Sequence, residues 1–378
     1  MSLNSTIAYL RDITDEVRFI FGLFNLVVGL ISNLSLIIIL TNLKIFHKTP
    51  SSFYLVAESY SNIGLLIFVC SSRISTGILR VDPTLVSLQW CKFRYGFNQL
   101  FGLCSLFTIC FTTIDQYFST HHRYAIRQLS TMKCAYLFLI IALLLSSSHG
   151  ILFYIYADIQ SLPFGCSIYN VMMKKYLSFF YFPVLSNALP ILITMTFSLL
   201  SYRNVRRIVR RQVPIRRRRL DQQLTSMILI RVVSLIFFGL PYIIISLYQL
   251  NVSNNDNNLK STIAVFLGAL FYSLLYTNFS INFYLFLLIS SRFRCQVKHF
   301  IRKLFHHCCH LRSSSRHIKF KNNQITPETF VNFYLVLLIS SRFRCQVKNL
   351  IRKLFHYFCC PVCLSKRTKS NTNQKMFQ

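Results

Sequence analysis

Acidic residues are scarce in this chain, and their scarcity narrows the classes of protein to which it can belong. Only ten of its 378 residues are Asp or Glu, and charged residues of both signs make up 14% against 53% hydrophobic residues. A compact soluble domain with this balance could not keep its apolar surface away from water. A proton pump or cation channel is also disfavoured, because these proteins need more carboxylates in mid-membrane.

The sequence also lacks the features of a secreted, catalytic or metal-binding protein. The N-terminus has no short apolar core with a small-residue cleavage site, so the first span is expected to act as its own insertion signal. Thirteen cysteines in so long a chain do not make a disulfide scaffold, and most lie in apolar segments. We find no catalytic or cofactor motif and expect no enzyme. Zinc binding by the Cys/His tract 306–310 is the less favoured alternative to membrane-proximal, acylated cysteines.

Seven apolar segments are long enough to cross a bilayer, which takes about 20 helical residues. The sequence therefore predicts an all-α membrane protein, a seven-transmembrane helix bundle within 17–290. The predicted spans are 17–41, 53–79, 92–118, 134–157, 176–202, 224–249 and 261–289.

Basic residues predict the orientation of this bundle. The connections 42–52, 119–133, 203–220 and 292–378 together hold 32 Lys and Arg. The opposite connections, 1–16, 80–94, 158–175 and 250–260, hold only seven, with six acidic residues. Because basic loops stay in the cytoplasm, the N-terminus is predicted to be outside the cell. The same distribution argues against nucleic acid as a partner, since the short basic loops are tied to the lipid bilayer at both ends.

The two ends of the chain carry smaller predicted features. Segment 1–16 is the predicted extracellular N-terminus, and Asn4 and Asn251 begin glycosylation patterns on the outer side. Residues 291–309 predict a short amphipathic cytoplasmic helix followed by Cys308 and Cys309, which are palmitoylation candidates.

The cytoplasmic tail 310–378 contains a partial duplication. Residues 282–306 recur at 332–356 with 22 of 25 positions identical. The second copy has only about 11 apolar residues before Arg342, too few to span a bilayer. We assign it no function of its own.

Polar residues within the spans are costly, so they are candidates for function. They are Asn33, Glu58, Asn62, Arg73, Asn98, Asp115, Arg231, Asn278 and Asn282. So many amides predict a buried hydrogen-bonded network that includes Asn33 and Asn62. Glu58 and Asp115 are expected near the cytoplasmic ends of their helices, where water reaches them.

The third span carries the most specific pattern. Cys91 stands at its outer end, and Asp115-Gln116-Tyr117 ends it 24 residues later. Further matches, in order, are Asn33, Asn62, Pro190, Phe238-Gly239-Leu240-Pro241, Asn282-Phe283-Tyr284-Leu285-Phe286 and Arg292-Phe293-Arg294. Over about 17–305 the chain resembles a divergent, peptide-receptor-like member of the rhodopsin-like (class A) G-protein-coupled receptors, which have a Cys and Asp-Arg-Tyr at the same spacing.

The resemblance implies a plasma-membrane receptor with an extracellular ligand and a heterotrimeric G protein as partners. It implies a Cys91–Cys166 disulfide that closes a loop of about 75 residues and shapes the ligand mouth. It also implies that Pro190 and Pro241 kink their helices, so that the inner half of the sixth helix can swing and open a crevice for the G protein.

The chain departs from the family where signalling is concerned. Gln116 replaces the family's Arg, so the usual ion pair between the third and sixth helices cannot form. We expect a neutral hydrogen bond from Gln116 to Asp221 in its place. Arg231 of the sixth helix is a second candidate to replace the missing ion pair. Asn62 in place of Asp predicts weak sodium sensitivity. The residues expected to act in activation and coupling are Asp115, Gln116, Tyr117, Asp221, Arg231, Pro241, Asn282 and Phe286.

The ligand is expected in the outer half of the bundle. Its candidate wall residues are Arg73, Asn98, Gln99, Tyr242, Gln249, Tyr272 and Tyr276, although simple helix packing explains each tyrosine equally well. Asn98 stands where amine receptors have Asp, which disfavours a monoamine; Arg73 and the tyrosines suit a peptide with an acidic group. Two alternatives remain open: a secondary transporter, and a seven-helix receptor or scaffold that has lost G-protein coupling.

Overall fold

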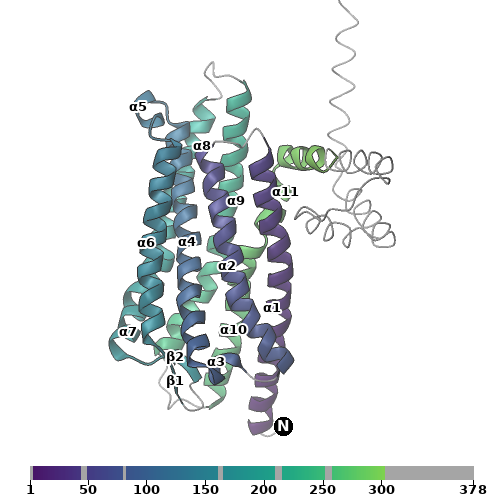
Figure 1. Cartoon of the computed structure of the whole chain (residues 1–378), viewed down its shortest axis with the longest axis vertical. Helices are drawn as coiled ribbons and strands as arrows, with labels where there is room; N and C mark the ends of the chain where they lie inside the picture. The colour runs from purple at the N-terminus through teal and green to yellow at the C-terminus, as the bar shows by residue number, and fades with distance from the viewer. Residues whose placement is uncertain are drawn as a thin grey trace, which may run out of the picture. The chain divides into compact units, whose positions relative to one another are not determined.

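In the part of the chain that the structure describes, the protein is a helical bundle with a small β-hairpin. The computed structural model describes residues 3–43, 49–79, 82–160, 165–208, 215–251 and 258–302. Within these ranges, seven helices are long and apolar enough to cross a membrane, which confirms the predicted fold class (Figure 1). Residues 303–378, including the Cys/His tract and the duplicated segment, lie outside the described part.

The first four spans are single long helices. They are α1 (Leu3–Asn42), α2 (Pro50–Leu79), α4 (Leu88–Thr120) and α6 (Met132–Tyr156). Two one-turn helices, α3 (Pro83–Val86) and α5 (Tyr124–Arg127), lie in the connections. Helix α1 begins at Leu3 rather than at residue 17, so the predicted N-terminal segment continues the first span as helix.

The fifth span is irregular, and its irregular part does not begin at the expected proline. It runs through α7 (Val171–Tyr176), a π-helical segment (Leu177–Ala188) and α8 (Leu189–Ile208). Pro183 lies inside the π-helical segment, where the Leu189 N–H donates to the carbonyl of Val184, five residues back. Proline has no N–H to donate, so wide turns accommodate it. Pro190 instead lies in the first turn of α8.

The sixth span is α9 (Ile215–Asn251), which continues as helix through Pro241. The seventh is not the continuous helix that we predicted over 261–289. Helix α10 (Asn258–Ser280) ends before Ile281, whose backbone leaves the helical region, and α11 (Asn282–Ile289) follows. Residues 291–302 then form the predicted short helix, which lies across the direction of the spans in Figure 1. Its Phe293 and Val297 are buried in a cluster with α1, α2 and α9.

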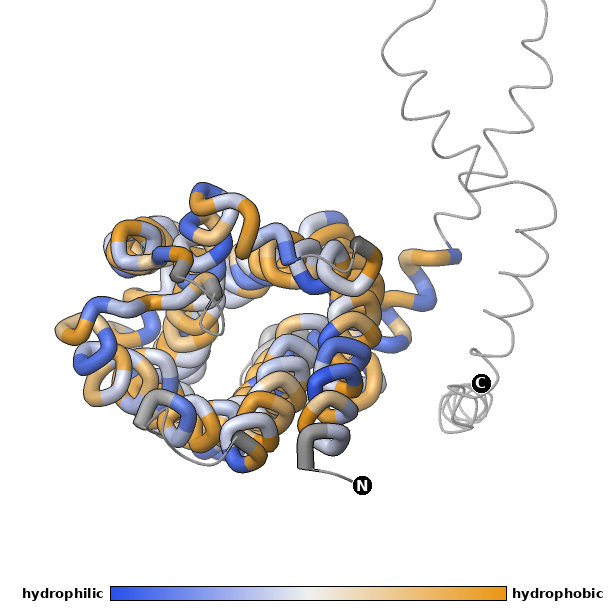
Figure 2. The backbone as a smooth tube through the Cα atoms, turned by 90° about the horizontal axis from the view of Figure 1, so that it is seen from below, coloured by the Kyte–Doolittle hydropathy of each residue, from blue (hydrophilic) through white to orange (hydrophobic). Residues whose placement is uncertain are grey.

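Helix α4 is the centre of the bundle and packs against α2, α6, α8 and α9. Small residues allow the closest approach: a Cβ added to Gly150 of α6 would lie 3.0 Å from the Gly96 carbonyl of α4. The outer surface keeps large apolar side chains exposed, among them Leu144, Phe237 and Ile244, and Figure 2 shows the apolar residues around the ring of helices. Such a surface suits lipid rather than water.

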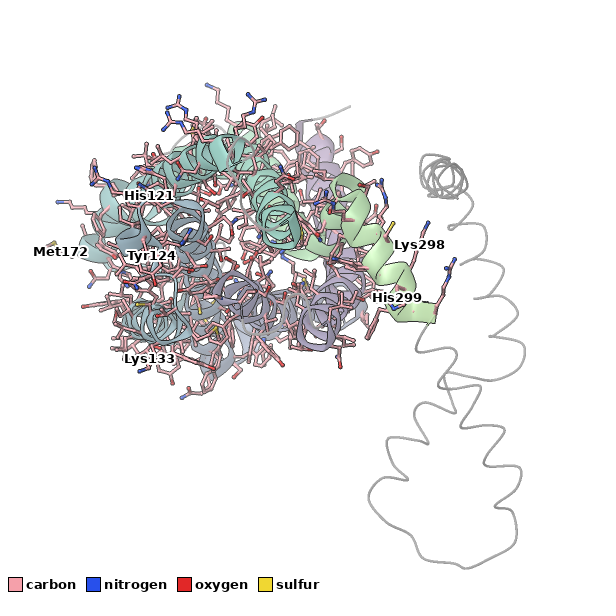
Figure 3. All side chains as sticks on the ribbon, turned by 90° about the horizontal axis from the view of Figure 1, so that it is seen from above. His121, Tyr124, Lys133, Met172, Lys298 and His299 are labelled. Carbon is pink, nitrogen blue, oxygen red and sulfur yellow. A yellow bond between two sulfur atoms is a disulfide. The ribbon has the colours of Figure 1, made fainter. Side chains whose placement is uncertain are left out.

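The two ends of the bundle differ. At one end lie the N-terminus of α1, helix α3 and the hairpin formed by β1 (Ala157–Gln160) and β2 (Gly165–Ile168) (Figure 1). We call this the disulfide end, because the Cys91–Cys166 bond lies there. The opposite end, which carries α5 and the C-terminus of α8, is called the basic end. Figure 3 views this end, with His121, Tyr124 and Lys133 among its labelled residues.

Candidate functional site

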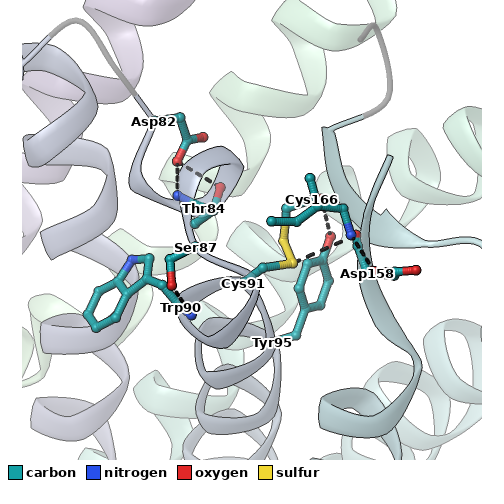
Figure 4. The surroundings of a disulfide bond; sticks show 9 residues. Asp82, Thr84, Ser87, Trp90, Cys91, Tyr95, Asp158 and Cys166 are labelled. Carbon is teal, nitrogen blue, oxygen red and sulfur yellow. Dashed lines mark hydrogen bonds between the residues drawn. A yellow bond between two sulfur atoms is a disulfide. The ribbon is translucent and has the colours of Figure 1, made fainter. Parts of the chain in front are cut away.

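The disulfide ties the β-hairpin to the start of α4 (Figure 4). Cys91 and Cys166 are bonded with their Cα atoms 5.9 Å apart and 75 residues apart in sequence, which confirms the predicted pair. Ser87 caps α4 by accepting a hydrogen bond from the Trp90 N–H at 3.3 Å. The Tyr95 hydroxyl donates to the Cys166 carbonyl at 3.5 Å. The hairpin is therefore held over the bundle from two turns of α4.

An outer cavity of about 710 Å³ opens beneath this hairpin, between the helices. Its wall includes six of the seven residues predicted to contact a ligand: Arg73, Asn98, Gln99, Tyr242, Gln249 and Tyr272. Its charged wall residues are the cations Arg18, Arg73, Arg94 and Lys174 and the acids Asp15 and Asp82. Both acids are engaged, since Asp15 pairs with Arg18 at 2.9 Å and Asp82 accepts two hydrogen bonds from Thr84. The cavity therefore carries an excess of positive charge.

Arg73 of α2 projects into this wall without an acidic partner. Its guanidinium lies 4.4 Å from the centre of the Tyr272 ring and donates to the Ser273 hydroxyl at 3.0 Å. The ion pairs in the described part of the chain are Arg18–Asp15 and Arg231–Glu58, so the neutral groups of α10 hold Arg73. A cation within a span is costly unless its charge is compensated.

Tyr272 of this wall belongs to a tyrosine cluster whose other members, Tyr181 and Tyr276, line a second, smaller cavity of about 90 Å³. The Tyr276 hydroxyl donates to the amide oxygen of Asn98 and lies 2.8 Å from the Tyr272 hydroxyl. The Tyr181 hydroxyl donates in the same way to Gln99. The two amides thus tie α4 to α10 and to the π-helical segment.

Gln249 lines the outer cavity, but its side chain contacts the neighbouring helix. Its amide nitrogen donates to the Ala264 carbonyl at 2.7 Å. It also lies so close to Gly268 that an added Cβ there would come within 2.2 Å. Its side chain therefore packs α9 against α10.

A buried ion pair lies nearer the basic end. The Nε of Arg231 in α9 donates to Glu58 Oε1 in α2 at 2.8 Å, and their side chains are only 1% and 3% exposed. Arg231 Nη1 also donates to the backbone and side-chain oxygens of Asn278 in α10. The amide of Asn282 in α11 donates to the same Glu58 oxygen at 3.1 Å. One charged centre thus joins the second, sixth and seventh spans.

The structure contradicts the expected exposure of Glu58 and Asp115 to water, and it shows a contact of Arg231 that the sequence did not predict. Glu58 and Asp115 were expected to reach water, but they are 2% and 6% exposed. The sequence singled out Arg231 and Glu58 separately and did not predict that they pair. Charge could have indicated this pair. A buried arginine within a span needs an acidic partner, and the spans contain few acidic residues that could supply one.

The Asp115-Gln116-Tyr117 motif is held by neutral groups. Asp115 accepts hydrogen bonds from the hydroxyls of Ser51 and Ser130, each at 2.7 Å. Gln116 Nε2 donates to the Thr225 hydroxyl of α9 at 3.0 Å. Helix α4 therefore reaches the sixth span by a neutral hydrogen bond at Thr225, one turn from Asp221. The Asp221 side chain lies outside the described part of the chain.

The family of this chain follows from its match to a family model. The model of the seven-transmembrane receptors of the rhodopsin family matches residues 32–286, which is about two thirds of the chain. The chain belongs to this receptor family. Compared with curated proteins individually, the receptor matches none.

Other predicted positions in the receptor can now be placed. Asn62 donates to the Asn33 side chain at 3.2 Å and accepts from the Ser105 hydroxyl at 2.7 Å, so these amides join α1, α2 and α4. Phe286 is buried and contacts the Phe293 ring edge-on, with centroids 6.2 Å apart. The side chains of Asn4 and Asn251, and all of Cys308 and Cys309, lie outside the described residues.

Proposed function

We propose that this multi-pass receptor stands in the plasma membrane with its disulfide end outside the cell, binds a peptide with an acidic group there, and activates a heterotrimeric G protein at its basic end. Membership of the rhodopsin family supports a receptor with an external ligand and a G protein as partners. The charge asymmetry of the connections supports the orientation.

Arg73 is the observation that carries the ligand proposal. It lines the outer cavity, it lies within a span, and its neighbours on α10 are neutral. A carboxylate from the ligand would supply the missing counter-charge and form charge-assisted hydrogen bonds. Arg94 and Lys174 on the same wall would attract an acidic ligand toward the cavity.

The positive charge of the cavity wall favours a ligand with an acidic group, such as a peptide, over a small amine. A volume of about 710 Å³ lies within the roughly 300–1,000 Å³ range of ligand pockets and has room for more than one side chain. The two acids on its described wall are already engaged by Arg18 and Thr84. The wall carries four cations against two acids, and this positive excess disfavours a cationic amine.

Activation is proposed to work through α9. In this structure Arg231 holds α9 to α2 and α10, and Gln116 holds it to α4. For the basic end of α9 to swing outward, these contacts must break or shift. A ligand that contacts Tyr242, one residue after Pro241, would act on the same helix from the outer cavity.

The test is a screen of neuropeptides that measures nucleotide exchange on a purified G protein, followed by retesting of each active peptide on variants of the receptor. Arg73→Gln should weaken potency by about tenfold to a hundredfold, since a hydrogen bond to a charged group contributes about 1.5–3 kcal/mol. Arg18→Gln is the matched control, because it removes a cavity cation that already has an acidic partner. Unchanged potency in Arg73→Gln and Arg73→Glu would reject the pairing.

One observation favours a second candidate, a receptor that has lost its coupling. Gln116 stands in place of the family's Arg and makes a neutral contact with Thr225. If peptides bind the purified receptor but stimulate no nucleotide exchange on any G-protein class, this alternative holds. The transporter alternative would require solute uptake into vesicles, and membership of a receptor family argues against it.

A further inference from the structure

The seventh span breaks at Ile281, between α10 and α11, although residues 278–284 include no proline that would interrupt a helix. The last carbonyl groups of a helix have no partner within that helix, so the end of α10 must obtain donors from elsewhere. Asn33 of α1 supplies one by donating to the Phe279 carbonyl at 3.0 Å. Side chains of other helices therefore complete this end of α10.

Arg231 of α9 supplies the donor for the Asn278 carbonyl. Its Nη1 lies 3.1 Å from this oxygen and also donates to the Asn278 side-chain oxygen. A cation is favourable at the C-terminus of a helix, where the backbone carbonyls carry partial negative charge. The Glu58 carboxylate adds a full negative charge, 2.8 Å from Nε of the same arginine. Oxygen atoms from α2 and α10 thus hold one guanidinium from α9.

Two further side chains hold these oxygen atoms in place. Ser234, three residues after Arg231 on α9, donates to the Asn278 side-chain oxygen at 2.8 Å. Asn282 of α11 donates to Glu58 Oε1 at 3.1 Å, and all of these residues are buried. We call the oxygen atoms of Glu58 and Asn278 the guanidinium site. It has the composition of a small cation site, and the chain fills it with its own side chain.

The position of Arg231 along α9 links this site to the proposed motion. Arg231 lies ten residues before Pro241, on the half of α9 that leads to the basic end. The oxygen atoms that hold it belong to other helices, so this half of α9 cannot swing outward while the guanidinium stays bound. Its departure would leave the Glu58 charge in the interior without a partner, which is costly. The guanidinium site therefore opposes the swing.

We propose that the Arg231 guanidinium is a built-in cation that holds the off state of the receptor, in which α9 keeps its position in this structure, and that the guanidinium site binds a free guanidinium ion when this side chain is shortened. The inference deepens the proposed function, because it rests on the outward swing of α9. A purely structural ion pair would stabilise the fold equally in both positions of α9. The built-in cation favours one position, so its removal changes the position of α9 as well as the melting temperature.

Chemical rescue of Arg231→Ala tests the proposal on the full-length receptor in lipid nanodiscs. This variant removes the cation and leaves a space of its shape beside Glu58 and Asn278. Its basal nucleotide exchange on a purified G protein should rise by about tenfold, because the loss of a hydrogen bond to a charged group changes an equilibrium by at least that factor. Millimolar guanidinium chloride, far below the molar range in which it denatures proteins, should return the exchange toward the wild-type value.

Two small molecules and one double variant are the matched controls. Urea has the shape of guanidinium without its charge, and choline has a positive charge without N–H donors, so neither should lower the exchange. Glu58→Leu combined with Arg231→Ala lacks the carboxylate and should not respond to guanidinium. The wild type should not respond either, because its site is already filled. An equal effect of urea, or a full response of the double variant, would reject the guanidinium site.

The distance between α6 and α9 at the basic end is a second readout that needs no G protein. Spin labels are attached through unnatural residues at the exposed positions Lys133 and Ser226, so that native cysteines stay unlabelled. Arg231→Ala should lengthen this distance, and guanidinium should shorten it again. If the distance responds while no receptor stimulates exchange, the built-in cation stands and the proposed coupling fails. If peptides stimulate exchange in the wild type while Arg231→Ala changes neither readout, the coupling stands and the built-in cation is rejected.

Arg231→Lys decides the question if Arg231→Ala is not recovered folded. Lysine keeps the charge, but its ammonium is a point charge and cannot engage Glu58 and Asn278 together with the planar fork of a guanidinium. Basal exchange and the distance between the two labels should then both exceed the wild-type values in a folded receptor. If both equal the wild-type values, the guanidinium does not hold the off state and the proposal is rejected.

Discussion

Two arginines within the spans show how the same residue serves different purposes. Arg231 is almost fully buried, and Glu58 and Asn278 supply its counter-charge and acceptors. Arg73 lines a cavity and has only neutral contacts on α10. A buried ion pair is weak evidence for stability, but removal of one partner leaves an uncompensated charge. The protein supplies the counter-charge of the first arginine itself, and we propose that the ligand supplies that of the second.

This difference gives a prediction for the buried pair. Glu58→Gln should destabilise the receptor by about 3–5 kcal/mol, because Arg231 would be left charged inside the bundle. Glu58→Leu combined with Arg231→Met should recover most of this loss, since no unpaired charge remains. Thermal unfolding of Glu58→Leu, Arg231→Met and the double variant measures the coupling. Additive losses in the double variant would show that the two side chains do not depend on each other.

At the scale of elements, α9 is the helix on which the proposed switch depends. It is bound to α4 through Gln116 and Thr225, and to α2 and α10 through Arg231. A hydrogen bond between neutral groups is roughly half as strong as one with a charged partner. The contact with α4 is therefore the weaker of the two, and we expect a noticeable population of receptors with α9 displaced in the absence of ligand.

Gln116→Arg tests that expectation. An arginine at this position can form a charge-assisted bond to α9, so basal nucleotide exchange should fall while the response to an active ligand is retained. Gln116→Lys serves as the control, because it adds the charge without the planar, two-pronged geometry of a guanidinium. If basal exchange is the same in all three proteins, a weak contact between α4 and α9 does not set basal activity.

The sequence predicted elements better than contacts between them. Seven spans follow from blocks of apolar residues, and the disulfide followed from family resemblance at Cys91 and Cys166. Hydropathy could not show that α1 starts at Leu3, because a polar helix that extends beyond the bilayer has no apolar signature. It likewise missed the break at Ile281, because apolar residues resume at Phe283, directly after Ser280 and Asn282, and the segment looks like one continuous span.

The candidate sites show the same limit. The seven ligand residues were chosen from their depth along each span, and all line one of the two cavities. The pairing of Glu58 with Arg231 depends on how α2 and α9 are rotated, and rotation is set by packing over the whole bundle. A single sequence contains no direct record of that packing.

For the whole molecule, orientation decides whether the two cavities can serve an external ligand. The connections at the basic end and the tail carry 32 Lys and Arg, against seven at the disulfide end. Each basic residue near an anionic inner leaflet contributes about 1 kcal/mol. The loop 203–220 alone has nine arginines and no acid, so its translocation across the membrane would be strongly unfavourable. These charges predict that the disulfide end faces outward.

Epitope tags at the two termini test this orientation in intact cells. A tag before residue 1 should bind antibody without permeabilisation, and a tag after residue 378 only with it. Replacement of Asn4 or Asn251 by Gln should reduce the apparent mass only where a glycan is attached, which gives a second marker for the outer side. An inverted pattern would place both cavities and Arg73 on the cytoplasmic side. The external peptide would then be rejected, whereas the Glu58–Arg231 prediction would stand, because it depends only on the interior of the bundle.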